Sequence, residues 1–222
     1  IMGMYVKFNP DIKITPVSGK FFNADASLFY NISKIPGVEA ISETLEEIAF
    51  FTYKDKQDFG MVKGVDTLFS AVSNIDSCIK EGVYLPNRSL SFNALIGLGI
   101  RNKLGIDLED PFASLTVYMP KNKENTPFEN PFRSRNLQPV GTFMIQQEYD
   151  NQYIITTLNV ARELLGNAKL LSAWEIKVAR NYEVKKVISD IQSIVKDKFY
   201  VKDYYAQEEG FIKLMRLEKW FS

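Results

Sequence analysis

The side chains that could carry chemistry are limited first by two features of the composition. The 222 residues include no histidine and one cysteine, Cys78. Without histidine there is no Ser-His-Asp or Cys-His triad, no imidazole base and no histidine-ligated metal. A single cysteine excludes an internal disulfide and a cysteine-rich zinc site, and we expect Cys78 to be a buried, unreactive thiol.

The carboxylates do not form a catalytic pattern either. Glu46 and Glu47 are adjacent in a predicted strand, so their side chains should face opposite sides of a sheet. Asp107, Glu109 and Asp110 lack the ligand spacing and central glycine of a calcium loop, which favours a polar turn. No Ser-x-x-Lys motif replaces the missing histidine base. Catalysis therefore has no visible support.

A glycine-rich segment resembles a nucleotide-binding loop only superficially. Gly97 and Gly99 are followed by Gly105 rather than by a glycine three residues later, and no strand clearly precedes them. We interpret the segment as part of a helix, predicted over residues 91–104, that packs closely on a neighbour.

Charge and hydropathy define the class of protein. Lys plus Arg and Asp plus Glu both number 27, so the formal net charge is zero, which argues against a nucleic-acid partner. The apolar fraction of 45% and the charged fraction of 24% are ordinary for a folded protein. The longest apolar stretches, at 48–53 and 94–100, fall far short of the roughly 20 residues that span a bilayer. The length suits one large domain or two small ones.

The two ends of the chain predict one layer of structure. Near the start, a strand at 8–17 and a short helix capped by Asn23 or Asp25 precede a long strand at 38–53. Near the end, alternation predicts a strand, and apolar spacing of three and four residues predicts an amphipathic helix. The remaining predicted elements of this layer are a polar turn at 54–58, strands at 59–65, 173–179 and 199–203, and helices at 183–195 and 208–222.

The middle of the chain has a different character and is predicted to be an inserted unit. We expect residues 1–66 and 168–222 to form the first subdomain and residues 67–167 to form the second. Asn159 is expected to cap a helix that ends at Gly166. The other predicted elements are helices at 66–72 and 91–104 and strands at 114–119, 137–145 and 153–157.

Residues 120–136 are predicted to form a long projecting loop. The stretch holds three prolines, no strand-length apolar run, and four basic residues against two acidic ones. Loops of this length are uncommon and are usually functional or disordered. Phe128 and Phe132 in such a loop are candidate anchors for a partner. The alternative is that both rings pack back onto the domain.

Several short motifs, in order along nearly the whole chain, together resemble one family. The motifs are FNPDIKI at 8–14, IPGV at 35–38, VKGVD at 62–66, the glycine-containing stretch at 97–110, VGTF at 140–143, EYD at 148–150, LNVA at 158–161 and LEKW at 217–220. With these motifs in this order, the chain is similar to the periplasmic domain of ABC transporter permeases of the lipoprotein-releasing type, whose core is shared with the MacB class.

The resemblance implies a fold and a role. It implies an α+β fold, in which a porter-like split β-α-β layer carries an inserted sabre-like α+β subdomain. It places the domain on the periplasmic side of the bacterial inner membrane, between two membrane helices of the permease. It implies no cofactor, no metal and no catalysis, because ATP hydrolysis belongs to a separate cytoplasmic ATPase subunit. A second permease copy or a paralogue is an expected partner.

The resemblance also implies a partner-binding hook within loop 120–136. In lipoprotein-releasing permeases a proline-bearing hook recruits the periplasmic lipoprotein chaperone, and an acylated lipoprotein is the cargo. By position, Pro127, Phe128, Pro131 and Phe132 would form the tip. Arg133 and Arg135 would add polar contacts.

Two other interpretations stay open from the sequence. One is a MacB-like efflux or mechanotransmission domain that meets an adaptor protein. The other is a stand-alone binding module or an enzyme that uses carboxylates. In each permease interpretation the strand near Phe8 and the helix near Trp220 would carry motion from the membrane, which requires at least two packed arrangements.

Overall fold

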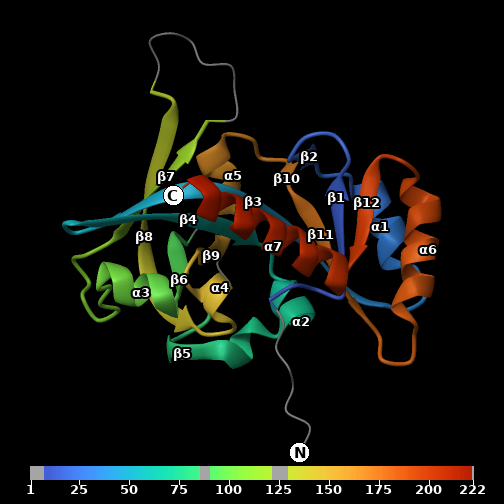
Figure 1. Ribbon diagram of the computed structural model, residues 1–222, viewed down its shortest axis with the longest axis horizontal. Helices are drawn as coiled ribbons and strands as arrows, with labels where there is room; N and C mark the ends of the chain where they lie inside the picture. Colours follow the sequence, from blue (N-terminus) through green and yellow to red (C-terminus); the bar gives the residue numbers. More distant parts are fainter. Residues whose placement is uncertain (1–7, 86–90, 122–129, 222) are drawn as a thin grey trace, which may run out of the picture.

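A long antiparallel hairpin organises the molecule (Figure 1). The computed structural model describes residues 8–85, 91–121 and 130–221. The hairpin strands are β3, Val38–Tyr53, and β4, Lys56–Val65, and they pair along the whole length of β4. The other strands are β1 Ile12–Pro16, β2 Phe22–Asn23, β5 Ile79–Gly82, β6 Asn93–Gly97, β7 Leu115–Pro120, β8 Phe132–Phe143, β9 Tyr153–Thr157, β10 Leu170–Leu171, β11 Ala173–Val178 and β12 Phe199–Asp203.

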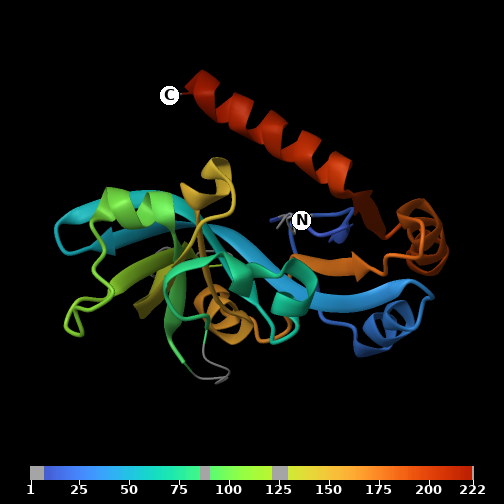
Figure 2. The same ribbon diagram turned by 90° about the horizontal axis from the view of Figure 1, so that it is seen from below.

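Helices lie on both sides of the sheet that the hairpin organises. Figure 2 shows α7 crossing one face while α1 lies on the other. The helices are α1 Ala26–Ser33, α2 Phe69–Ser73, the 3₁₀ turn Ile75–Cys78, α3 Leu98–Leu104, α4 Gln147–Asp150, α5 Leu158–Leu165, α6 Val184–Val195 and α7 Tyr204–Phe221.

The strand order places both ends of the chain on one side of the hairpin. Within the described residues the main sheet runs β12-β1-β11-β3-β4-β9-β6-β8-β5. The pairs β4–β9 and β6–β8 are parallel, and the other neighbours are antiparallel. β7 joins both β3 and β8, so the pairings β3-β4-β9-β6-β8-β7 return to β3. The sheet continues across the predicted subdomain boundaries, and the division into two subdomains stays a prediction.

The half that contains β1, β11 and β12 has a core between the sheet and two helices. Trp174 is fully buried there, with the Phe22 ring centroid 4.9 Å away. The spacing of Val187, Ile191 and Val195 turns one face of α6 toward this core, as the sequence predicted. Asp25 caps α1 by accepting a hydrogen bond from the Leu28 N–H, at 3.0 Å.

The other half is held together by a close approach of α5 to β4. A Cβ atom at Gly64 would lie 2.4 Å from the Ala161 Cβ, so only glycine permits this contact. Gly166 ends α5 in the left-handed conformation, as predicted. The N-cap is Thr157, whose hydroxyl accepts from the Val160 N–H, and not Asn159 as predicted.

Other predictions for this half were wrong in their boundaries. Residues 91–104 are not one helix, because β6 precedes α3. A run buried on both faces does not alternate, so its pattern does not distinguish a strand from a helix. The polar turn is confined to Lys54 and Asp55, since β4 begins at Lys56. β8 begins at Phe132, so the predicted loop 120–136 is partly strand.

Candidate functional site

The β7–β8 hairpin carries those predicted hook residues that can be placed. Pro127 and Phe128 lie outside the described residues. The Pro131 carbonyl accepts a hydrogen bond from the Lys121 N–H at 2.8 Å, and Phe132 pairs with Pro120. The hairpin extends away from the rest of the sheet in Figure 1. The Phe132 side chain is 50% exposed, so it does not pack into the core.

The two arginines of the predicted hook contact the domain itself. The Arg135 Nε donates to Glu163 Oε1 at 2.7 Å, and its Nη2 pairs with the same carboxylate. The Arg133 Nη1 donates to the Glu163 carbonyl at 3.3 Å, near the C-terminus of α5. A cation at this end of a helix is favourable. Both arginines therefore hold the hairpin on α5, and their contact with a partner stays a prediction.

A buried ion cluster that sequence reasoning missed joins three neighbouring strands. Lys63 of β4 is 1% exposed, and its ammonium lies 2.9 Å from the Glu175 carboxylate of β11 and 3.2 Å from Glu46 of β3. The Phe8 and Phe69 ring centroids lie 4.8 and 5.0 Å from the same ammonium. The signal in the sequence was a lysine within an otherwise apolar strand, MVKGV.

In this ion cluster the attraction between opposite charges shifts the pKa values of Lys63 and Glu46 more than burial does. Burial acts to lower the pKa of Lys63, but Glu175 and Glu46 raise it on balance. Burial acts to raise the pKa of Glu46, yet Lys13 and Lys63 bring it down to about 2. The Tyr153 hydroxyl also donates to Glu46, at 3.2 Å. Lys63 and Glu46 are therefore charged and paired at neutral pH.

The depressed pKa of Glu46 predicts acid sensitivity. A carboxylate whose pKa falls from 4.5 to about 2 on folding stabilises the protein above pH 4.5 and loses that effect as pH falls toward 2. The contribution is about 3 kcal/mol at neutral pH. Urea unfolding should therefore show Glu46→Gln clearly less stable than the parent at pH 7, with the difference shrinking between pH 4.5 and 2.5. A difference that stays constant over this range would contradict the assignment.

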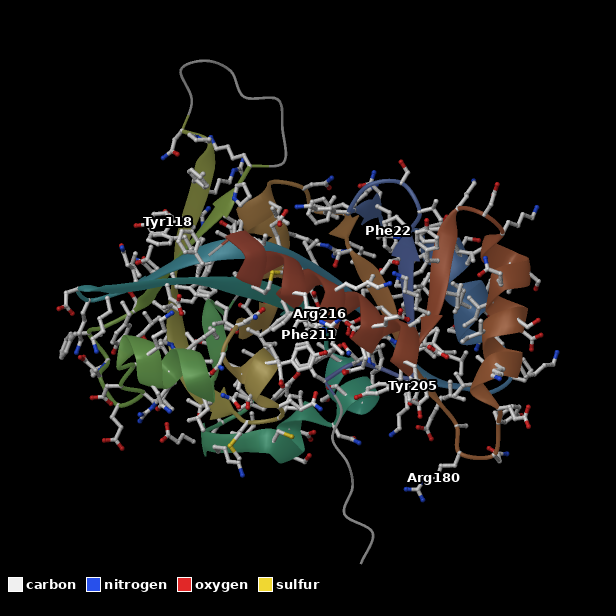
Figure 3. The ribbon with its side chains drawn as sticks, viewed as in Figure 1. Phe22, Tyr118, Arg180, Tyr205, Phe211 and Arg216 are labelled. Atoms are coloured by element: carbon white, nitrogen blue, oxygen red, sulfur yellow. The ribbon has the colours of Figure 1, made fainter. Side chains whose placement is uncertain are left out.

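A second arrangement ties the start of the described chain to α7. We define the terminal junction as Phe8, Asn9, Tyr149, Glu208 and Phe211. The Tyr149 ring stacks between the others, with centroids 4.2 Å from Phe8 and 4.6 Å from Phe211. Figure 3 shows Phe211 beneath α7, on the side of α4.

Hydrogen bonds reinforce the terminal junction. The Asn9 Nδ2 donates to the Tyr149 hydroxyl at 2.8 Å and to Glu208 Oε1 at 3.1 Å. The buried Gln207 donates from Nε2 to the Pro10 carbonyl at 3.1 Å. Burial and the Glu208 carboxylate raise the pKa of Tyr149, so its hydroxyl stays protonated. Because Phe8 also contacts Lys63, the junction and the ion cluster form one connected network.

The other candidate residues have structural explanations. Glu46 and Glu47 do face opposite sides of the sheet, as predicted, and Glu47 accepts a hydrogen bond from the Ile48 N–H. Asp110 pairs with Lys54 at 3.1 Å. Burial raises the pKa of the Cys78 thiol, as expected for an unreactive cysteine. Within residues 8–85, 91–121 and 130–221, no three potential metal ligands gather.

The glycine-rich segment follows a strand after all, contrary to the prediction. β6 ends at Gly97 and α3 begins at Leu98. Cβ atoms at Gly97 and Gly99 would lie 2.3 Å from the Asp150 carbonyl and 1.8 Å from the Asn151 amide oxygen. The space that a phosphate would need is therefore filled by the protein's own chain, and the glycines serve close packing.

Comparison with known proteins gives the fold a context. No protein-family model matches the chain, and no curated protein matches it. The crystal structure of the periplasmic region of MacB from Actinobacillus actinomycetemcomitans matches with a TM-score of 0.59 at 10% identity, covering 90% of this chain and 91% of that one. The extracellular domain of the noncanonic ABC-type transporter YknZ from Gram-positive bacteria matches with a TM-score of 0.57 at 10% identity, covering 86% and 99%.

The chain has the fold of these extracytoplasmic transporter domains. The predicted α+β fold class is thereby confirmed. The match extends over almost the entire length of both solved domains. Of the helices formed by the described residues, none is both long enough and apolar enough for a membrane span.

Proposed function

We propose that this chain is the extracytoplasmic domain of an ABC-type transporter permease, exposed on the periplasmic side of the inner membrane. The observation that carries the proposal is the fold match over 90% of this chain and 91% of the MacB periplasmic region. The domain binds and transmits motion rather than catalysing a reaction. ATP hydrolysis takes place on a separate cytoplasmic ATPase subunit, and a second permease copy or a paralogue completes the transporter.

The connected network supports the mechanical part of this proposal. The segment at Phe8 and helix α7 are the parts through which motion of the membrane helices would enter. The terminal junction holds them together, so they move as one body. Phe8 passes that displacement to Lys63, whose carboxylate partners lie on β3 and β11. Motion at one point is thus spread over three strands.

The β7–β8 hairpin is the proposed partner-binding element. It projects from the sheet, and it exposes Phe132 while Arg133 and Arg135 fix its base to α5. An exposed aromatic on a supported hairpin provides a binding anchor. The proposed partner is the periplasmic lipoprotein chaperone, with an acylated lipoprotein as the transported cargo.

Capture by the purified chaperone tests the partner. We expect the domain to retain the chaperone, and the double variant Phe128→Ala/Phe132→Ala to lose at least about 90% of it, since anchor residues typically contribute about 2 kcal/mol or more. Phe112→Ala is the matched control, because Phe112 is 96% exposed and lies outside the hairpin. No capture by the parent would remove the chaperone as the partner, and equal capture by both variants would remove the hairpin as its binding element.

A MacB-like role is the second candidate, and the fold match to the MacB periplasmic region favours it. In that case the hairpin would meet a periplasmic adaptor protein instead. An adaptor encoded beside the transporter, tested in the same capture experiment, separates the two candidates: the one retained by the parent and lost in the hairpin variant is the partner.

A further inference from the structure

A cleft of about 660 Å³ lies between α7 and the sheet face opposite α1. Its size falls within the range of small-molecule sites, about 300–1,000 Å³. The sheet contributes residues of β1, β3, β4 and β12, and α7 contributes Ala206, Gly210 and Phe211. A Cβ atom at Gly210 would meet nothing within 4 Å, so α7 leaves open space over the cleft beside Phe211.

One end of the cleft is basic. Lys13 of β1 and Lys202 of β12 are direct cross-strand partners, and both line the cleft. Like charges in this position repel each other. The Lys13 ammonium lies 3.7 Å from Glu46. Lys202 forms no ion pair with a carboxylate in the described part of the chain, and its ammonium lies 5.3 Å from the Tyr200 ring centroid.

The other end of the cleft carries three large apolar side chains beside the Asp58–Lys103 ion pair. Ile48 and Met61 are cross-strand partners on β3 and β4, and Phe59 stands two residues from Met61 on the same face. Ile48 is 52% exposed and Phe59 is 69% exposed. Large apolar side chains at this exposure beside a cleft provide a surface for an apolar ligand.

The charges in the cleft determine which head group fits. Its carboxylates are already neutralised, because Glu46 pairs with Lys13 and Lys63, and Asp58 pairs with Lys103 at 2.7 Å. Lys202 supplies positive charge that no described carboxylate offsets, and an anion beside Lys13 would relieve the repulsion between the two lysines.

We propose that this cleft binds an anionic amphiphile, whose carboxylate or phosphate head lies between Lys13 and Lys202 and whose alkyl chain lies along Ile48, Phe59 and Met61. The site is separate from the hairpin, and it requires no partner protein. Its ligand is defined by negative charge at one end and a single apolar chain at the other.

Titration calorimetry with monomeric dodecyl phosphate, below its micelle-forming concentration, tests the proposal. We expect saturable binding with one site per chain. Dodecyltrimethylammonium and inorganic phosphate should each bind at least about tenfold more weakly, because one has the wrong charge and the other has no chain. Lys202→Gln and Ile48→Ser should each weaken binding about five- to tenfold.

Matched controls keep the result specific to the cleft. Lys185→Gln on the exposed side of α6 and Val83→Ser, at a site 62% exposed, should leave the affinity within about twofold of the parent. Equal affinity for the cationic and anionic detergents, or equal losses in cleft and control variants, would overturn the proposal.

Co-sedimentation with phosphatidylglycerol vesicles identifies the source of the ligand. Binding there shows that the head and chain come from lipid within a membrane, and monomer binding without it shows that they come from an extracted amphiphile. Failure of the calorimetric test leaves chaperone or adaptor capture by the hairpin unaffected, so the two proposals fail separately.

Discussion

Replacing Lys63 with methionine is expected to lower the free energy of unfolding by about 3–5 kcal/mol, the cost of leaving a buried partner charge uncompensated. The Lys63 side chain is 1% exposed, and that of Glu175 is equally buried. Methionine fills nearly the same space without the charge. The loss of stability therefore measures the cost of leaving the buried carboxylates without a partner charge, and not the cost of a cavity. Urea unfolding at pH 7 measures it.

Two further variants test whether the loss of stability in Lys63→Met comes from unpaired buried charge. Lys103→Met breaks an ion pair of similar length in which Lys103 is 65% exposed, and it should cost no more than about 1 kcal/mol. Adding Glu175→Gln to Lys63→Met should restore part of the lost stability, because one of the stranded charges is removed. Equal losses from Lys63→Met and Lys103→Met, or no recovery in the double variant, would show that the cluster is not a buried charge network.

Replacing Phe8 with alanine is expected to cost about 3–5 kcal/mol, the range for large aromatic truncations in a core. Phe8 is 3% exposed and touches both Tyr149 and the Lys63 ammonium. Its removal weakens the connection between the terminal junction and the ion cluster, which then runs through Tyr153, in contact with Tyr149 and hydrogen-bonded to Glu46. Besides lowering stability, the change should increase hydrogen exchange of backbone amides in the first half of α7, which measures release of that helix.

Phe112→Ala provides the comparison for Phe8→Ala. Phe112 is 96% exposed, so its truncation should change stability by less than about 0.5 kcal/mol and leave α7 protection unchanged. If Phe8→Ala destabilises the domain while α7 keeps its protection, Phe8 fills the core without coupling the two chain segments.

Elements with strong local signals were predictable. The strand at 38–53 is confirmed to the residue, since an apolar stretch lies between Gly37, at φ 94°, and the turn at Lys54. The helix 183–195 is confirmed within one residue because its apolar spacing matches its buried face. β6 was missed because Ala94, Leu95 and Ile96 are all buried, and a run without alternation carries no period.

The candidate site was predictable only where it is local. The prolines and aromatics predicted a projecting loop over 120–136, whereas β8 already begins at Phe132. The arginine contacts with Glu163 depend on a helix 28 residues away in sequence from Arg135. The ion cluster unites Glu46, Lys63 and Glu175, and its members come from strands whose pairing is set by long-range register. The spacing of residues along the sequence does not predict how β3 pairs with β4 and β11.

We propose that nucleotide-driven movement in the transporter reaches this domain and rearranges it. Spin labels on the exposed Ser134 of β8 and Ser189 of α6, in the membrane-embedded transporter with Cys78 replaced by alanine, measure the separation of the hairpin from the opposite half. We predict that the distance distribution shifts between the nucleotide-free and ATP-bound transporter, because coupling requires two packed arrangements. One unchanged distribution in both states would contradict the claim.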